Sequence, residues 1–401
     1  MSLKFNIEKK LNKRGRAGKI ETENGSIETP AFIVVGTKAT VKSLTPEQVS
    51  SLGAQAILAN TYHLYLEPGV EVLKKAGGFQ KFMNWKGPSF TDSGGFQAFS
   101  LGAAFNNKVG KIGNVKMEPT NDRDEDLATQ HNNALAKVDE EGVTFKSIID
   151  GSTHRFTPER SMEIQHAIGA DIMFAFDECT SPLAPHVYQK EAMDRTHRWA
   201  KRSLEYHRSA KTNQALFGII QGGRFEDLRK ESARIIGDMD FDGFGIGGSF
   251  DKEDLYTAVG WVADELPEDK PRHLLGIGEP VDLILGIENG MDTFDCVVPT
   301  RIARNGTIFT RNGKIHIANA EYKMDFGKLD DGCECYTCTH YSRAYVSHLF
   351  RVKEMTAATL GSIHNLYFLV NLVKEARKAI LDDSFEKFKD KFISNYISRG
   401  L

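Results

Sequence analysis

The most constraining feature of this sequence is a recurring unit, in which a short apolar run leads into a polar residue or a glycine and a helical stretch follows. Six such runs lead into Asn60, Asp177, Gln221, Gly247-Gly248, Gly276 and Asp295. Helical stretches between them include residues 192–207, 226–237 and 252–266. Repeated β-α units with functional groups at strand ends predict a (β/α)8 TIM barrel, whose active site lies at the carboxyl ends of its strands. A doubly wound sheet is the alternative, disfavoured because no dinucleotide-type glycine fingerprint follows the first strand.

The residues before this repeat have the pattern of a β-hairpin or small sheet. Residues 19–22 and 26–29 flank Asn24-Gly25, which predicts a hairpin with a two-residue primed turn. Further along, Thr45-Pro46 and Thr157-Pro158 each place a capping hydroxyl before a proline, which predicts a helix start. We interpret residues 1–401 as a single barrel domain with an N-terminal hairpin or sheet.

Residues 102–141 depart from the repeat. They are rich in Asn, Lys, Asp and Gly, and they show little apolar periodicity. A long irregular stretch inside a compact domain is typically a lid, a binding loop or a segment without fixed structure. We interpret residues 102–141 as an insertion loop. It is either a plain surface insertion or a segment that lies near the site as a lid or contacts the substrate.

A cysteine cluster marks the late part of the chain. Three of the five cysteines fall within six residues, at Cys333, Cys335 and Cys338. Thiolates this close, with one histidine as the fourth ligand, suit tetrahedral zinc. Spacing alone does not select the histidine, because His340 and His348 are nearer to the cysteines than His364. The cluster predicts a zinc-binding subdomain at residues 305–366, and it favours a reducing cytoplasm over a disulfide framework.

The charge balance limits how this chain could bind nucleic acid. The formal net charge is -3, so binding to nucleic acid requires a local basic patch. The candidate residues are Arg301, Arg304, Arg311 and Lys314. The alternative for these four is an ordinary solvated face. No apolar run approaches the roughly 18 residues of a membrane span, and residues 1–10 lack an apolar signal core, so a cytoplasmic protein is expected.

Three acids at strand ends suggest the chemistry. Asp92, Asp177 and Asp295 are each expected at the barrel mouth, although a lone acid there could merely cap a helix. Paired carboxylates suit glycosidic chemistry, in which one attacks the anomeric carbon and the other manages protons. Asp177, Gln221 and the Gly247-Gly248 backbone together offer donors and acceptors that suit the edge of a planar heterocycle.

Taken together, these motifs resemble the bacterial type of the tRNA-guanine transglycosylase family. The matching strings occur in the family's order and cover nearly the whole chain: Val35 to Thr37, Asn60 to Leu64, Asp92 to Gln97, Phe176 to Cys179, Gln221 to Gly223, Gly247-Gly248, Phe294 to Arg301, Arg304 to Gly306, and the cysteine cluster with His364-Asn365. The resemblance implies a (β/α)8 barrel with a C-terminal zinc subdomain. It selects His364 as the fourth ligand and implies one structural zinc ion per subunit.

The resemblance also implies a role for each site residue. Asp295 would attack C1′ of the wobble guanosine (position 34) of tRNA, and Asp92 would be the general acid and base. The base would be bound by Ser93, Phe96 (by stacking), Asp177, Gln221, Gly248 and the carbonyl of Ser249. Arg301 and Arg304 would contact the anticodon loop, with uridine-guanosine-uridine as the recognition element. The target base must be flipped out to be reached.

Further implications concern the partner subunit and the incoming base. Tyr341, Tyr345 and His348 match a homodimer interface of the family, although a satisfied, partly buried histidine is the alternative for His348. Cys179 favours 7-aminomethyl-7-deazaguanine as the incoming base, in queuosine biosynthesis. Ser249-Phe250 stands where many bacterial relatives have Leu-Ala, so direct use of queuine in salvage stays an alternative.

Three other kinds of relative are less consistent with the sequence. A non-catalytic tRNA-binding subunit of a heterodimer is disfavoured because Asp92 and Asp295 are both present. Relatives that modify the D-loop carry additional C-terminal RNA-binding domains, for which 401 residues leave no room. A DNA-modifying relative is disfavoured by the anticodon-loop motif and the cysteine cluster. The expected activity is therefore exchange of the wobble guanine for a 7-deazaguanine through an Asp295-ribosyl intermediate.

Overall fold

The structure is a computed structural model that describes residues 3–98, 112–113, 136–147, 149–248, 250–251 and 255–397. At its centre, eight parallel strands close into a barrel. In barrel order they are β4 (Ala31–Val35), β5 (Ile57–Ala59), β6 (Ser89–Thr91), β11 (Ile172–Phe174), β12 (Ala215–Ile220), β13 (Gly243–Ile246), β15 (Arg272–Leu274) and β16 (Thr293–Cys296). Strand β16 pairs with β4 and completes the ring. The predicted (β/α)8 barrel is confirmed, and the doubly wound alternative is wrong.

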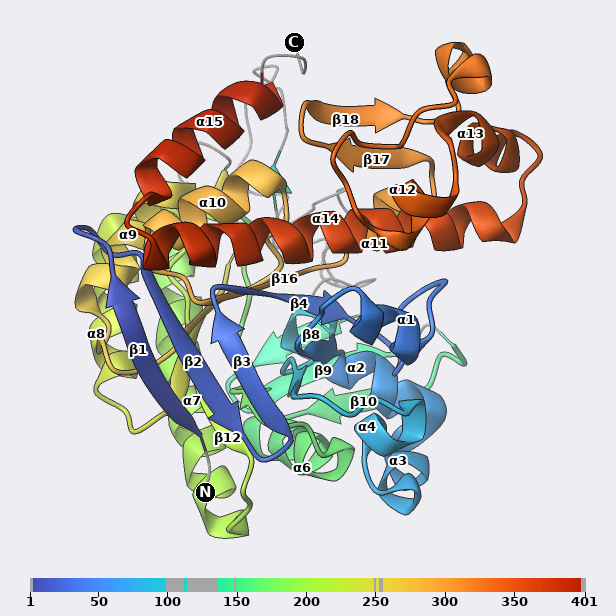
Figure 1. Cartoon of the computed structure of the whole chain (residues 1–401). Helices are drawn as coiled ribbons and strands as arrows, with labels where there is room; N and C mark the ends of the chain where they lie inside the picture. The colour runs from blue at the N-terminus through green and yellow to red at the C-terminus, as the bar shows by residue number, and fades with distance from the viewer. Residues whose placement is uncertain are drawn as a thin grey trace, which may run out of the picture.

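Helices surround the barrel (Figure 1). They are α1 (Pro46–Ser51), α2 (Thr61–Leu64), the π-turn η1 (Tyr65–Gly69), α3 (Val70–Ala76), α4 (Phe79–Met83), α6 (Pro158–Ile168), α7 (His186–Ala210), α8 (Glu226–Gly237), α9 (Leu255–Glu265) and α10 (Pro280–Glu288). The two predicted helix starts are confirmed. The Thr45 side chain forms a capping box with Gln48, and the Thr157 hydroxyl accepts from the Arg160 backbone.

The barrel interior is a packed apolar core. It is filled by side chains from neighbouring strands, namely Ile33, Leu58, Phe90, Phe174, Phe217 and Ile219. A three-stranded antiparallel sheet of β1 (Lys4–Lys10), β2 (Arg16–Thr22) and β3 (Gly25–Thr29) adds Ile20 and Ile27 to this core. These packed apolar side chains form the floor of the barrel, and the polar residues at the strand ends lie above it.

The predicted hairpin exists, but the predicted turn is wrong. In the register of β2 and β3, Thr22 pairs with Gly25, so the loop residues are Glu23 and Asn24. The positive φ of 134° falls on Gly25, while neither loop residue has a positive φ, so the turn is not a primed one. Asn24 instead donates from its backbone and its side chain to Oδ1 of Asp171.

The predicted insertion lies mostly outside the described residues, but its end is ordered. Strand β8 (Ala136–Asp139), a turn at Glu140 and Glu141, and β9 (Gly142–Lys146) form an antiparallel sheet with β10 (Thr153–Phe156). Residues 136–141 are thus part of a hairpin and not of an irregular loop. A further short pair joins β7 (Ile112–Gly113) to β14 (Phe250–Asp251).

The C-terminal part has its own small hydrophobic cluster, which includes Ile308, Leu329, Val346, Leu360 and the three clustered cysteines. Its elements are α11 (Val298–Ala303), β17 (Thr307–Thr310), β18 (Gly313–His316), the 3-10 helix η3 (Ala320–Met324), α12 (Tyr336–His340), α13 (Arg343–Arg351), α14 (Met355–Leu381) and α15 (Phe385–Ile397). Helix α14 runs from this cluster across the barrel, where it contacts β4, β2 and α10 (Figure 1). Across the described ranges, no helix combines the length and apolarity needed to cross a membrane.

Candidate active site and metal centre

Asp295 lies on the inner face of β16, and two donors hold its Oδ1. Its side chain is largely buried, and its Oδ1 accepts from the Gly276 backbone N–H at 2.8 Å and from His273 Nε2 at 3.0 Å. His273 comes from β15 and is fully buried, and its Nδ1 lies 2.8 Å from the Thr293 hydroxyl. The carboxylate that the sequence singled out is therefore fixed in one orientation.

Asp92 follows β6 directly and is also fixed by backbone donors. Its Oδ1 accepts from the Thr61 N–H at 2.9 Å and from the Gly94 N–H at 3.1 Å, and the Asn60 amide donates to Oδ2. Asn60 also caps α2, because its Oδ1 accepts from the His63 N–H. Asn60, at the end of β5, thus orients Asp92, at the end of β6.

Asp177 and Gln221 form one polar unit at the ends of β11 and β12. Asp177 Oδ2 accepts from Gln221 Nε2 at 2.7 Å, and Oδ1 accepts from the Ser93 hydroxyl at 3.0 Å. Gln221 is 3% exposed, and its Oε1 has no hydrogen-bond partner among the described residues. A buried acceptor of this kind is costly unless a ligand satisfies it, so the unit is suited to binding a polar planar molecule.

Gly248 allows the backbone to approach the same unit closely. Its φ is 105°, and a Cβ at this position would lie 2.5 Å from Arg229 Nη2 and 3.1 Å from Gln221 Oε1. Arg229 is fully buried, and it donates to the carbonyls of Gly223 and Gly247 at 2.7 and 2.8 Å. Burial lowers the pKa of Arg229 to about 9. A side chain at residue 248 would clash, which explains the glycine.

Phe96 and Ser249 are two further residues that the sequence predicts to contact the substrate, and the structure says less about them. Phe96 lies in the helical turn 95–98 just after Asp92 and is half-buried, so its stacking role stays a prediction. The residue before it, Gly95, lies so close to the Asp177 carbonyl that a Cβ would be 2.6 Å from that oxygen. Ser249 lies outside the described residues.

A buried ion pair beside Asp177 was not predicted. Glu178 stands between Asp177 and Cys179, and its side chain is fully buried. It accepts from Arg195 Nη1 and from the Tyr188 hydroxyl, the latter at 2.9 Å. Although burial opposes the charged guanidinium, the attraction of Glu178 raises the pKa of Arg195. Adjacency to Asp177 was the only available sequence signal, since Arg195 is 17 residues away.

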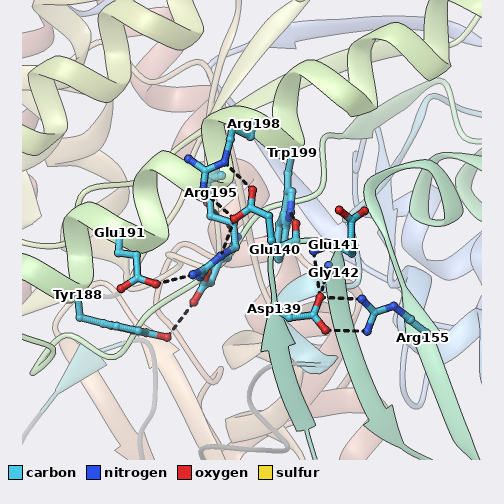
Figure 2. Close-up of polar contacts among 12 residues, drawn as sticks. Asp139, Glu140, Glu141, Gly142, Arg155, Tyr188, Glu191, Arg195, Arg198 and Trp199 are labelled. Carbon is cyan, nitrogen blue, oxygen red and sulfur yellow. Dashed lines mark hydrogen bonds and ion pairs between the residues drawn. The ribbon is translucent and has the colours of Figure 1, made fainter.

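The same arginine lies beside the hairpin that ends the predicted insertion (Figure 2). Glu140, in the turn between β8 and β9, pairs with Arg198 at 2.5 and 2.8 Å, and it lies 3.6 Å from Arg195 Nε. The Trp199 indole N–H donates to the Glu140 carbonyl at 2.7 Å. Helix α7 therefore connects the β8–β9 turn to the loop that carries Asp177.

The cysteine cluster has the geometry of a metal site. The ligand atoms of Cys333, Cys335, Cys338 and His364 lie within 4.8 Å of one another. His364 Nδ1 is 3.8, 3.4 and 3.3 Å from the three sulfurs, close to the roughly 3.5 Å expected between nitrogen and sulfur around tetrahedral zinc. His364 Nε2 donates to the Phe309 carbonyl at 2.7 Å, which orients Nδ1 toward the sulfurs.

The choice of His364 over its rivals agrees with this geometry. His340 is exposed and stacks on Tyr336, with ring centroids 4.3 Å apart, while His348 is exposed on α13. The partly buried alternative for His348 is therefore wrong. Tyr341 and Tyr345 stack on each other at 5.3 Å.

The predicted basic cluster is smaller than the sequence suggested. Arg311 pairs with Glu375 through two contacts, and Lys314 pairs with Glu279 at 2.7 Å. Arg301 is exposed on α11, and Arg304 donates to the Thr300 carbonyl at 2.9 Å. Burial and the nearby Arg301 charge lower the pKa of Arg304, so the two cations face the same region.

Comparison with known proteins agrees with this arrangement. Residues 11–124 and 123–398 match the family described as Queuine tRNA-ribosyltransferase. The chain is 49% identical over 399 residues to the Queuine tRNA-ribosyltransferase of Thermoanaerobacter pseudethanolicus, and the match covers 98% of each chain. It is 45% identical over 397 residues to the protein of that name from Fusobacterium nucleatum, again over 98% of each chain. This chain therefore belongs to the queuine tRNA-ribosyltransferase family and is a transferase enzyme.

Proposed function

We propose that this enzyme exchanges the guanine at the wobble position (34) of tRNA for 7-aminomethyl-7-deazaguanine, through a covalent Asp295-ribosyl intermediate. The observation that carries the proposal is the pair of fixed carboxylates, Asp295 and Asp92, at the mouth of one barrel beside the Asp177–Gln221 unit. Paired carboxylates with separate roles suit substitution at an anomeric carbon. The reaction belongs to queuosine biosynthesis and takes place where tRNA is, in the cytoplasm.

In the first half-reaction, Asp295 attacks C1′ of the flipped guanosine. The bond between C1′ and the guanine nitrogen breaks, the electron pair stays with guanine, and Asp92 supplies the proton. In the second half-reaction, Asp92 takes a proton from the incoming base, which attacks C1′ and releases Asp295. Two successive inversions retain the ribose configuration, and the covalent bond keeps the tRNA in place between the steps.

The polar unit supports recognition of the base. The Asp177 carboxylate can accept from the N–H groups of the guanine edge, and Gln221 and the Gly248 backbone can complete the hydrogen bonds. Ser93 holds Asp177 from the other side, so this hydroxyl is a supporting contact. Phe96 is proposed to stack on the base, and the Ser249 carbonyl to face its substituent.

Contact with the anticodon loop is proposed for Arg301 and Arg304. Both lie on or just after α11, which follows the strand that carries Asp295. Positive charge at this point would attract the phosphates on either side of the target in a uridine-guanosine-uridine sequence. Because the net charge is -3, this local patch has to supply the electrostatic attraction.

We propose that the metal is one zinc ion per subunit and that its role is structural. Four protein ligands would close the coordination sphere and leave no position for a substrate. Asn365, next to the ligand His364, accepts from the Phe309 N–H at 3.0 Å and donates to the Pro299 carbonyl at 3.1 Å. The ion would thereby hold together a subdomain at residues 305–366, in which β17 meets the start of α14, and Asn365 would attach this subdomain to the arginine-bearing α11.

A homodimer is proposed on the exposed aromatic surface of this subdomain. Tyr336 and Tyr345 are 50% and 44% exposed, and Tyr341 stacks on Tyr345. Aromatic side chains are enriched at interfaces between proteins. The occupant is proposed to be a second copy of the chain that contacts Tyr341, Tyr345 and His348.

The proposed substrate is tested by competition in base exchange. An anticodon stem-loop with a uridine-guanosine-uridine sequence is incubated with the enzyme and labelled guanine, and unlabelled 7-aminomethyl-7-deazaguanine or queuine is added. We expect 7-aminomethyl-7-deazaguanine to suppress labelling at a lower concentration than queuine, because queuine carries a bulkier substituent. Stronger suppression by queuine would instead support direct salvage. No labelling at all would identify a non-catalytic tRNA-binding subunit.

The buried ion pair beside Asp177 gives a second expectation. Glu178→Gln keeps the shape of the side chain but removes the charge that faces Arg195. We expect the KM for the free base to rise about tenfold, which corresponds to about 1.4 kcal/mol of binding free energy, because Asp177 and Cys179 flank this residue. Steady-state kinetics with varied base and saturating tRNA measures the change.

Glu191→Gln is the matched control. Glu191 also pairs with Arg195, at 2.7 Å, but its side chain is 61% exposed and it belongs to α7 and not to the loop that carries Asp177. Its loss should leave the KM for the base unchanged, since an exposed ion pair contributes little. Equal changes in both variants would show that the KM depends on the number of carboxylates paired with Arg195, and not on the position of the Asp177 loop.

A further inference from the structure

The nucleophile's neighbour His273 is neither a predicted site residue nor part of the proposed reaction. It pairs with Thr293 across β15 and β16, and its ring extends along the inner face of β16 from the Thr293 hydroxyl to the Asp295 carboxylate. The ring is 0% exposed, and it packs against Phe90 and Phe174 with centroid distances of 5.6 and 5.1 Å. A buried polar ring in an apolar barrel floor is costly unless both nitrogens are satisfied, as they are here.

The hydrogen bond to Asp295 shows that Nε2 of His273 carries a proton. A carboxylate oxygen only accepts, so at 3.0 Å the proton of this hydrogen bond belongs to His273 Nε2. The Thr293 hydroxyl can donate to Nδ1 or accept from it, so the assignment holds for both the neutral and the charged ring. Gly276 N–H supplies the second donor to the same Asp295 oxygen, at 2.8 Å.

We propose that His273 is a positioning residue for the nucleophile, which directs attack through Asp295 Oδ2 and speeds the release of Asp295 from the ribose. The proposal rests on the proposed covalent reaction. With Oδ1 held by His273 and Gly276, the new bond to C1′ forms from Oδ2, and Oδ1 becomes the carbonyl oxygen of the ester. The ring holds this orientation because Thr293 fixes its other nitrogen.

The two donors act most strongly when Asp295 leaves. As the incoming base attacks C1′, the bond between C1′ and Oδ2 breaks, and its electron pair returns to the carboxylate. Negative charge then spreads onto Oδ1, where the hydrogen bonds from His273 and Gly276 become charge-assisted and stronger. The same donors slightly lower the nucleophilicity of Asp295 in the first step. Loss of the His273 donor should therefore slow release of the adduct more than its formation.

The test compares His273→Phe with His273→Gln. Phenylalanine keeps a ring in the packed floor but has no donor, whereas the glutamine amide can reach the place of Nε2. Each variant is mixed with an anticodon stem-loop, the covalent adduct is quantified on denaturing gels, and guanine is then added to follow its release. In His273→Phe we expect adduct formation within about threefold of wild type and release slowed roughly tenfold or more, with release largely restored in His273→Gln.

The possible outcomes separate the proposal from the underlying reaction. If wild type forms no adduct, the proposed covalent reaction itself is wrong. If wild type forms the adduct but His273→Phe releases it at the wild-type rate, or loses formation and release equally, the role of His273 is overturned. If His273→Phe does not fold, Thr293→Val decides: we expect adduct release slowed about threefold, and an unchanged rate would contradict the proposal.

Discussion

Replacement of Asp295 with asparagine is expected to abolish base exchange while the protein stays folded and binds tRNA. Asparagine has the same shape, and its Oδ1 can still accept from Gly276 and His273, so the local hydrogen bonds persist. The amide is not a nucleophile toward C1′, and loss of an enzymatic nucleophile typically costs about 10⁴-fold or more in turnover. Exchange of labelled guanine into an anticodon stem-loop measures the loss, and denaturing gels report the missing adduct.

A control for this variant is Asp240→Asn. Asp240 is an exposed acid whose side chain is 80% accessible and pairs with Arg208 on the protein surface. Exchange and adduct formation should match wild type in this variant. If Asp295→Asn still forms the adduct, Asp295 is not the nucleophile. If Asp295→Asn has a lower thermal stability than wild type, its loss of exchange says nothing about chemistry. In that case exchange and adduct formation are measured in Asp295→Glu, because this variant keeps the negative charge but shifts the carboxylate oxygens.

Removal of the metal is expected to destabilise the fold before it affects bond breaking. The Cys338→Ser variant should lose the proposed zinc ion, and its Tm should fall by the order of 10 °C, because structural zinc sites supply several kcal/mol of folding free energy. The affinity for tRNA should fall in parallel, since Asn365 links the ligand helix to the segment before Arg301. Metal analysis, thermal unfolding and a tRNA binding assay measure the three effects.

Cys179→Ser is the control for this experiment. Cys179 is equally buried but lies outside the cluster, two residues after Asp177. Its replacement should leave the zinc content at one ion per chain and change the Tm little, whatever it does to base selectivity. If Cys338→Ser keeps its metal and its Tm, the four-ligand assignment is wrong. If a metal-free protein binds tRNA normally but fails only in exchange, the metal takes part in catalysis.

The barrel and the polar strand ends could be predicted because they are local features of the sequence. An apolar run that stops at Asn60 or Asp177 specifies both a strand and the residue at its carboxyl end. Thr45 and Thr157 cap their helices as predicted, since a cap depends on residues within one turn. The order of the motifs then indicated which strand ends carry the acids.

The partners of those acids could not be predicted, because they are distant in sequence. His273 reaches Asp295 from the neighbouring strand β15, and Arg195 reaches Glu178 from the long helix α7. The primed turn at Asn24-Gly25 was wrong because Asp171, far along the chain, accepts two hydrogen bonds from Asn24. Ion pairs with Glu375 and Glu279 likewise reduced the basic cluster through tertiary contacts.

If the enzyme exchanges only the wobble guanine of tRNA, then label enters at that nucleotide alone, and position-resolved labelling shows where it enters. A stem-loop with guanosines both at the wobble position and elsewhere is incubated with the enzyme and labelled guanine, digested, and its labelled nucleotide located. We expect label only at the wobble guanosine within uridine-guanosine-uridine, and none when that guanosine is replaced by adenosine. Label at another guanosine, or label that persists after the replacement, would show that the enzyme does not act specifically at the wobble position.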